Sequence, residues 1–213
     1  MKKATITVNK NLLSRFGLIV LFVFYGFAEY ALADNAKVHP ALVITAQDVN
    51  QMRAEIARDG RFKTEFNNKK SQLDEKLALP KQVPVPRDSG GGFTHEVHKT
   101  NAQNMYDAAI IYQLTGDQKY ADYVRDLLLM YAELYPTLPL HPQRRTDAVI
   151  SAGKLFWQNL NESVWLVYTI QAYDAVLTAL TAPEREKIEK GILRPVALFL
   201  SEGSPHTFNT IHN

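Results

Sequence analysis

Helical periodicity on both sides of a three-residue turn is the feature that most constrains this fold. Residues 104–114 and 118–134 repeat apolar side chains at helical spacing, so each run has one apolar stripe. Between them, Thr115-Gly116-Asp117 combines a C-cap glycine with an N-cap aspartate. The pattern predicts two antiparallel helices joined by a short turn.

Helical patterns also flank this hairpin on both sides. The N-cap signal at Thr45 predicts a helix over residues 46–59, and a second helical run ends at Pro80. Residues 155–180 are apolar almost all round, which is typical of a helix buried on more than one side. Thr181, Pro183 and Glu184 predict a helix cap, with proline at a favoured first helical position and acid in the first turn, and open a further run to residue 200.

Breaks in these patterns complete the fold-class prediction. The prolines and glycines of residues 80–92 predict a loop, and Pro195 predicts a kink inside the last helical run. Trp165 lies in an apolar run and is expected in the core. We find no alternating segment that would form a strand and no fixed period that would form a solenoid. The expected class is all-α, a toroid of helical hairpins.

The first 33 residues are typical of an export signal. Basic residues precede the apolar run of residues 16–28, and an Ala-Leu-Ala sequence ends at Ala33. A helix of that length spans about 20 Å, less than the ~30 Å hydrocarbon core of a bilayer, which disfavours a membrane anchor. We expect a signal peptide over 1–33 and a mature part over 34–213 that is periplasmic or secreted, without membrane attachment.

The charge balance of the mature part bears on its partners. It carries 20 basic and 21 acidic residues, and the chain has no cysteine. Proteins that bind nucleic acid usually show a basic bias or stripe, so nucleic acid is not an expected partner. Packing without disulfides must hold the fold. The sequence is compatible with a homo-oligomer.

A polar segment at residues 90–101 is the first candidate site. It places His95, Glu96 and His98 after three glycines. The two histidines are three positions apart and could share a metal on one helix face, but the His-Glu-x-x-His peptidase motif is not formed. The interpretations are a polar loop entering a helix, the rim of a cleft for an anionic sugar and, least favoured, a metal site. We expect no metal and no cofactor.

A second candidate site surrounds Trp157. A tryptophan beside amide side chains often faces a sugar, because the ring packs on C–H groups while the amides bond oxygens. Gln158 and Asn161 supply such amides on one helix face, and Arg145 and Lys154 supply positive charge for a sugar carboxylate. Burial of Trp157 in the core is the alternative.

The last residues form a third polar cluster. His206, Asn209, His212 and Asn213 alternate with bulky residues after a helix stop at Gly203. A terminal tail of polar filler would not carry such bulky residues. We therefore expect the chain to be the front part of a longer protein.

Three motifs together resemble the oligoalginate lyases of polysaccharide lyase family 17, which are related to heparinase II/III-type lyases. They are residues 91–99, 154–162 and 208–213, in the family's order. The likeness covers residues 39–213 and the N-terminal half of the family. It implies an (α/α) toroid, incomplete here, followed by a β-sandwich domain that this chain lacks. It also implies exolytic release of an unsaturated monosaccharide from uronate oligomers.

The resemblance also implies residue roles. A uronate lyase removes H5, and neutralising the adjacent carboxylate lowers the barrier to that step. By motif position, Asn213 is the catalytic amide, and His212 precedes it at the substrate. Gln158 would line the substrate site, with Arg145 a weaker candidate for pairing a sugar carboxylate. The family's next histidine and its acid/base tyrosine fall beyond this chain, so the chain alone is expected to lack part of the active site.

Two other functional classes remain open. One is a non-catalytic, all-α module that binds acidic glycans through Arg145, Lys154, Gln158 and the histidine-rich segment. The other is a helical scaffold for a protein partner, motivated by the tyrosine-rich hairpin around Gly116.

Overall fold

The structure is a computed structural model that describes residues 38–143 and 152–203. The chain divides into two compact units, Met1–Val38 and His39–Asn213. The fold described below belongs to the second unit. The predicted signal peptide and its cleavage site lie outside the described residues.

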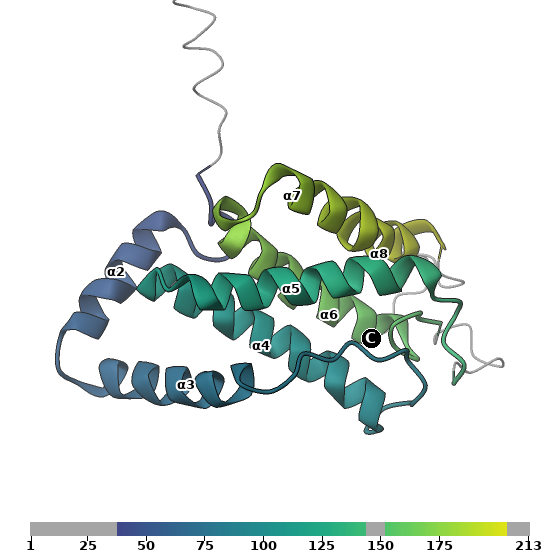
Figure 1. The fold of residues 1–213 in the computed structure, drawn as a ribbon, viewed down its shortest axis with the longest axis horizontal. Coiled ribbons are helices and arrows are strands. Elements are labelled where there is room, and N and C mark those ends of the chain that lie inside the picture. The colour runs from purple at the N-terminus through teal and green to yellow at the C-terminus, as the bar shows by residue number, and fades with distance from the viewer. Residues whose placement is uncertain (1–37, 144–151, 204–213) are drawn as a thin grey trace, which may run out of the picture. The chain divides into compact units, whose positions relative to one another are not determined.

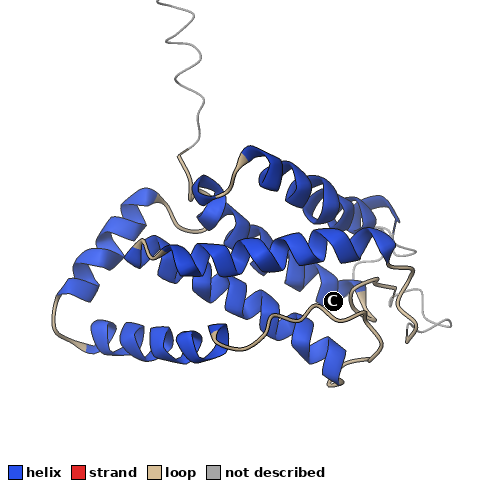
Figure 2. Ribbon diagram, in the orientation of Figure 1, coloured by secondary structure: helices blue, strands red, loops and turns tan. Residues whose placement is uncertain are grey.

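The described part of the second unit is built from helices and loops (Figures 1 and 2). The α-helices are α2 (Ala46–Ala57), α3 (Arg61–Leu77), α4 (Phe93–Thr115), α5 (Gln118–Leu134), α6 (Asn159–Val176), α7 (Ala182–Ile188) and α8 (Arg194–Leu198). Short 3-10 turns cover Tyr135–Thr137 and Leu177–Ala179, and π-helical turns cover Glu189–Leu193 and Phe199–Gly203. No strand occurs in these ranges, which confirms the all-α class. Closure into a toroid stays a prediction.

The predicted hairpin is formed by α4 and α5. Gly116 has φ 73°, a left-handed conformation that suits glycine, and its N–H donates to the Tyr112 carbonyl over 2.7 Å. The Asp117 side chain then accepts from the Lys119 N–H at the start of α5. Local capping chemistry therefore sets this turn.

Helix α4 begins at Phe93, well before residue 104, where the hairpin prediction placed its first helix. Its early turns bury polar side chains on the face that an apolar pattern would mark, namely Thr94, His95, His98 and Asn101. The polar segment is therefore helical from Phe93, and a search for apolar periodicity could not see it.

Two other boundaries depart from simple periodicity. Helix α6 begins at Asn159, whereas the apolar run suggested residue 155. A π-helical turn precedes α8 near Pro195, where the Arg194 N–H donates to the Glu189 carbonyl, and the kink itself stays a prediction. Proline lacks an N–H and its ring crowds the carbonyl four residues earlier, so the α-helical pattern cannot continue unchanged. At the start of α7, Thr181 and Glu184 form the expected cap.

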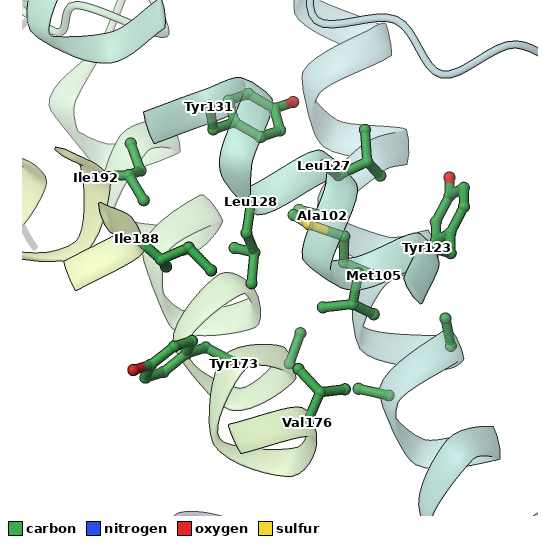
Figure 3. Close-up of a cluster of buried hydrophobic side chains, with 14 of the residues drawn as sticks. Ala102, Met105, Tyr123, Leu127, Leu128, Tyr131, Tyr173, Val176, Ile188 and Ile192 are labelled. Atoms are coloured by element: carbon green, nitrogen blue, oxygen red, sulfur yellow. The ribbon is translucent and has the colours of Figure 1, made fainter. Parts of the chain in front are cut away.

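Helix α5 lies at the centre of the core and packs against α4, α6 and α7 (Figure 1). Figure 3 shows the side chains that fill this region, including Leu127 and Leu128 of α5, Met105 of α4 and Val176 of α6. Each is fully buried, and burying such a side chain contributes about 1.5–3 kcal/mol. Trp165 is buried as predicted, with its ring edge-on to Tyr131.

A buried carboxylate on α6 ties down the first residues of this unit. Asp174 accepts hydrogen bonds from the backbone N–H groups of Ala41 (2.7 Å) and Leu42 (2.9 Å) and bonds the His39 imidazole. The segment before α2 is thereby fixed to the C-terminal half of α6.

None of the helices within the described ranges has the length and apolar character needed to span a bilayer.

Candidate functional site

A cavity of about 410 Å³ lies between α4 and α6. Glu96 and Lys99 line it from α4, and Asn161, Trp165 and Tyr168 line it from α6. The Lys99 ammonium lies 3.0 Å from a Glu96 carboxylate oxygen, so the wall carries a partly exposed ion pair. The amide and the aromatic surface around this hollow match the hydroxyls and the apolar C–H face of a sugar, while Glu96 already balances the positive charge of Lys99.

Phe156 joins two candidate segments that lie far apart in the sequence. Its ring meets the rings of His95 and His98 edge-on, at centroid distances of 5.1 and 6.0 Å. Phe156 also lines the cavity. The histidine segment at the start of α4 and the residues that lead into α6 are therefore parts of one site, a contact that the sequence could not reveal.

His98 is held by a buried hydrogen-bond network. Its Nδ1 lies 2.9 Å from the Tyr131 hydroxyl, and that hydroxyl oxygen accepts from the Asn101 amide at 3.0 Å. The same Asn101 amide donates to the Gln82 carbonyl at 2.8 Å. Burial lowers the pKa of His98 to about 4, so its ring is neutral at neutral pH. His98 therefore joins α4, α5 and the loop before α4.

Two further imidazoles are buried nearby. His95 is 4% exposed, its Nδ1 has no hydrogen-bond partner among the described residues, and burial lowers its pKa. Burial also lowers the pKa of His141 to about 4, and its backbone N–H donates to the Gly153 carbonyl. Within residues 38–143 and 152–203, no group of three or more histidine, aspartate or glutamate side chains is arranged to hold a metal ion. His95 reaches the cavity wall only through its ring contact with Phe156.

Hydrogen bonds between Asp88 and Thr94 fix the start of α4 beside this cluster. One Asp88 carboxylate oxygen accepts from the Thr94 N–H (2.9 Å) and hydroxyl (2.8 Å). A Cβ on Gly92 would lie 2.3 Å from the Asp88 Cβ, so this turn requires glycine. The neighbouring Gly90 lies against the Trp157 ring nitrogen. The glycine-rich sequence thus brings the loop onto the segment that leads into α6.

Glu162 is the main feature of this region that sequence reasoning missed. Its side chain is fully buried in the first turn of α6. One carboxylate oxygen accepts from the Tyr135 hydroxyl at 2.6 Å, and the other accepts from the backbone N–H groups of Lys154 and Leu155 at 2.7 and 3.1 Å. Burial raises the pKa of Glu162, and these hydrogen bonds oppose the rise. Its sequence neighbours Asn161 and Ser163 are polar, so no local signal marked Glu162 as buried.

The structure places half of the predicted site residues. Asn161 lines the cavity, and Gln158 immediately precedes α6 with no hydrogen bond to its side-chain amide from the described residues. The Lys154 ammonium lies 5.5 Å from the ring centroids of Tyr135 and Phe199. The other predicted site residues, Arg145, His212 and Asn213, lie outside the described residues.

Comparison with known proteins gives two relatives. The chain is 48% identical over 175 residues to an exo-oligoalginate lyase of Saccharophagus degradans, an alignment that covers 82% of this chain and 23% of that protein. It is 46% identical over 186 residues to an alginate lyase of Stenotrophomonas maltophilia, covering 87% of this chain and 24% of that protein. The chain thus spans about a quarter of the length of these relatives. No family model matches it.

Proposed function

Because this chain is homologous to a quarter of each of two alginate lyases, we propose that it is a segment of an exported polysaccharide lyase acting on alginate or oligoalginate. The reaction is a β-elimination. A base removes H5 of the uronate, the bond from C4 to the glycosidic oxygen breaks, and that oxygen takes a proton. The product is a sugar with a double bond between C4 and C5.

The barrier arises mainly from the negative charge beside the breaking C–H bond. Hydrogen-bond donors aimed at the substrate carboxylate stabilise the charge that develops there, and losing one such donor costs about 3 kcal/mol. We assign Asn213 to this catalytic role and His212 to substrate binding beside it. Both assignments rest on the motif at residues 208–213.

The described cavity supports the substrate-binding part of the proposal. Asn161 offers a hydrogen-bond donor to a sugar acid, and Tyr168 offers aromatic surface. Gln158 and Lys154 lie in the segment that leads to this wall, and the Gln158 amide makes no hydrogen bond to the described residues. We assign Asn161, Gln158, Lys154 and Arg145 to binding of the uronate chain.

The observation that carries the proposal is the 48% identity over 175 residues, combined with a cavity whose wall includes part of the motif at residues 154–162. The test uses the full-length natural protein with alginate oligomers and follows the ultraviolet absorbance of the conjugated alkene. We expect Asn213→Ala to lower kcat by about a hundredfold or more, the effect of removing one preorganised donor. Asn67→Ala, an exposed residue on α3, is the matched control.

Two results would contradict this assignment. Full activity of the Asn213→Ala protein would remove that residue from the catalytic set. Binding of alginate oligomers without any alkene product would favour the non-catalytic glycan-binding module.

Export is a separate part of the proposal. We infer that the signal at residues 1–33 directs the protein to the periplasm or the medium. Cell fractionation with mass spectrometry of the mature N-terminus checks this, and the expected mature chain starts at Asp34. A cytosolic protein that retains residues 1–33 would contradict it.

A further inference from the structure

One side chain in the first turn of α6 bonds the backbone of the segment that precedes the helix. Glu162 lies in the first turn of the helix, and its carboxylate reaches back to the backbone N–H groups of Lys154, Leu155 and Phe156, at 2.7, 3.1 and 3.5 Å. The residues before the helix and the helix itself are therefore locked together. One carboxylate thus joins the two ends of residues 154–162.

Residues 154–162, which the Glu162 carboxylate joins, include two that line the cavity. Phe156 and Asn161 line the cavity. Gln158 lies between them along the chain, at the position before α6. Displacing the backbone of residues 154–156 would move Phe156 and change the path of the chain into Gln158.

Resting on the proposed lyase function, we propose that Glu162 is a positioning residue, whose buried carboxylate holds Phe156, Gln158 and Asn161 in the arrangement that binds the uronate chain. It does not touch substrate, because its side chain is fully buried.

Tyr135 and Gly153 also have the residue types that a carboxylate at position 162 requires. Tyr135, just after α5, donates its hydroxyl proton to the oxygen that the backbone groups leave free. Gly153 approaches so closely that a Cβ there would lie 2.6 Å from the Glu162 carboxylate and 2.1 Å from the Phe156 carbonyl oxygen. Two separate segments, Tyr135 after α5 and residues 153–156 before α6, thus converge on one buried side chain.

An ordinary helix-capping role would predict a different outcome from a positioning role. A residue that only stabilises the fold lowers the free energy of unfolding, but the molecules that remain folded bind and turn over substrate normally. A positioning residue changes KM in the folded molecules, because the groups that contact substrate have moved. The two roles are separable by measuring kinetics and local structure under conditions where every variant is folded.

The experiment uses the full-length protein with Glu162→Ala and Glu162→Gln. Alanine removes the acceptor and leaves the backbone N–H groups of residues 154–156 without a partner. Glutamine has nearly the same shape: its amide oxygen can accept from the backbone groups, and its NH₂ group can donate to the Tyr135 hydroxyl oxygen. Glutamine is therefore the conservative variant that should restore the arrangement if Glu162 acts through position.

Asp174→Asn is the matched control. Asp174 is also a buried carboxylate on α6 that accepts from backbone N–H groups, but its partners are Ala41 and Leu42, outside the candidate site. This variant should lower stability while KM and kcat of the folded protein stay at their wild-type values.

Two readouts decide the outcome. Hydrogen exchange followed by mass spectrometry should show faster exchange across residues 154–156 in Glu162→Ala, and near wild-type protection in Glu162→Gln. KM for alginate oligomers should rise about tenfold in the alanine variant, the effect of losing one or two hydrogen bonds to substrate, with a smaller change in kcat. The glutamine variant should recover most of that loss.

The inference is overturned if folded Glu162→Ala keeps the wild-type KM, or if exchange across residues 154–156 does not change. If the alanine variant does not fold, Tyr135→Phe, which removes one partner only, is measured in the same way and should give a smaller shift in the same direction. A wild-type protein without lyase activity refutes the proposed function instead. The exchange experiment then still shows whether Glu162 fixes this segment.

Discussion

The two ends of α6 use the same device for different tasks. Glu162 in its first turn and Asp174 in its last turns are buried carboxylates that accept backbone N–H groups from segments outside the helix. Glu162 holds the residues beside the cavity, whereas Asp174 holds the segment before α2. One end of the helix organises the candidate site, and the other end organises the scaffold.

The pKa values of the two groups move in opposite directions. Burial raises the pKa of Glu162, which is fully buried and has only neutral partners. Burial also acts to raise the pKa of Asp174, but the N–H groups of Ala41 and Leu42 and the His39 imidazole outweigh it, so the pKa falls below its ordinary value. The two carboxylates therefore differ in their partners, because Asp174 also bonds an imidazole whereas Glu162 has only neutral donors.

The largest expected effect is a difference in stability between variants that remove Glu162 and Asp174. Glu162→Ala should lower the free energy of unfolding by roughly 3–5 kcal/mol, because it leaves backbone N–H groups buried and unpaired. Asp174→Ala should cost about 1–2 kcal/mol, since Ala41 and Leu42 are exposed and water can replace the carboxylate. Urea unfolding of both variants measures the difference. Equal losses would show that the two ends are equivalent.

A steric change tests how tightly the Glu162 end is packed. Gly153→Ala should lower the free energy of unfolding by about 1–3 kcal/mol, because its new methyl group would overlap the Phe156 carbonyl oxygen and the Glu162 carboxylate. Gly90→Ala is the control, because its nearest neighbour would be the Trp157 ring nitrogen at an ordinary 3.5 Å. Thermal unfolding of the pair checks this, and a Gly153→Ala protein as stable as Gly90→Ala would contradict it.

A pair of hydroxyl deletions sharpens the comparison further. Tyr135→Phe should cost about 1–2 kcal/mol of unfolding free energy, because one oxygen of the buried Glu162 carboxylate loses its partner. Tyr173→Phe on α6 should cost less, since its partner Glu189 is exposed and can bond water. The measurement is urea unfolding at neutral pH. A larger loss of unfolding free energy for Tyr173→Phe than for Tyr135→Phe would contradict the view that the buried Glu162 depends more on its tyrosine partner than the exposed Glu189 does.

The smallest effects are opposite pH dependences. Asp174 has a lowered pKa in the folded state, so its contribution is present above the ordinary value of 3.8 and is lost as pH falls below it. Glu162 has a raised pKa, so the folded state keeps its proton to higher pH and stability declines as pH rises above 4.5. The free energy of unfolding is measured across a pH series. Asp174→Asn should lose the fall in stability below pH 3.8, and Glu162→Gln should lose the decline above pH 4.5. Slopes of one sign in both cases would contradict this.

The sequence predicted those parts of the fold that depend on neighbouring residues. The turn at Gly116 and the cap at Thr181 are local, so glycine conformation and capping chemistry were sufficient. Apolar periodicity likewise identified the all-α class and the burial of Trp165. These features require no knowledge of which helices meet.

The parts that sequence reasoning missed depend on distant partners. The first turns of α4 bury His98 and Asn101, whose partner Tyr131 comes from α5, so no local pattern marks that face as internal. Glu162 looks like a surface residue until the segment before α6 folds back onto it. The roles of Asn213, His212 and Arg145 remain predictions, because those residues lie outside the described ranges.

Fastening α6 at both ends also restricts how the sequence can vary in length. Glu162 and Asp174 are twelve positions apart, which corresponds to about 18 Å along the axis. Adding or deleting one residue between them would rotate one end by about 100° relative to the other and shift it by about 1.5 Å. One of the two carboxylates would then point away from its backbone partners. Relatives that keep both contacts should therefore tolerate substitutions along this helix but not insertions or deletions.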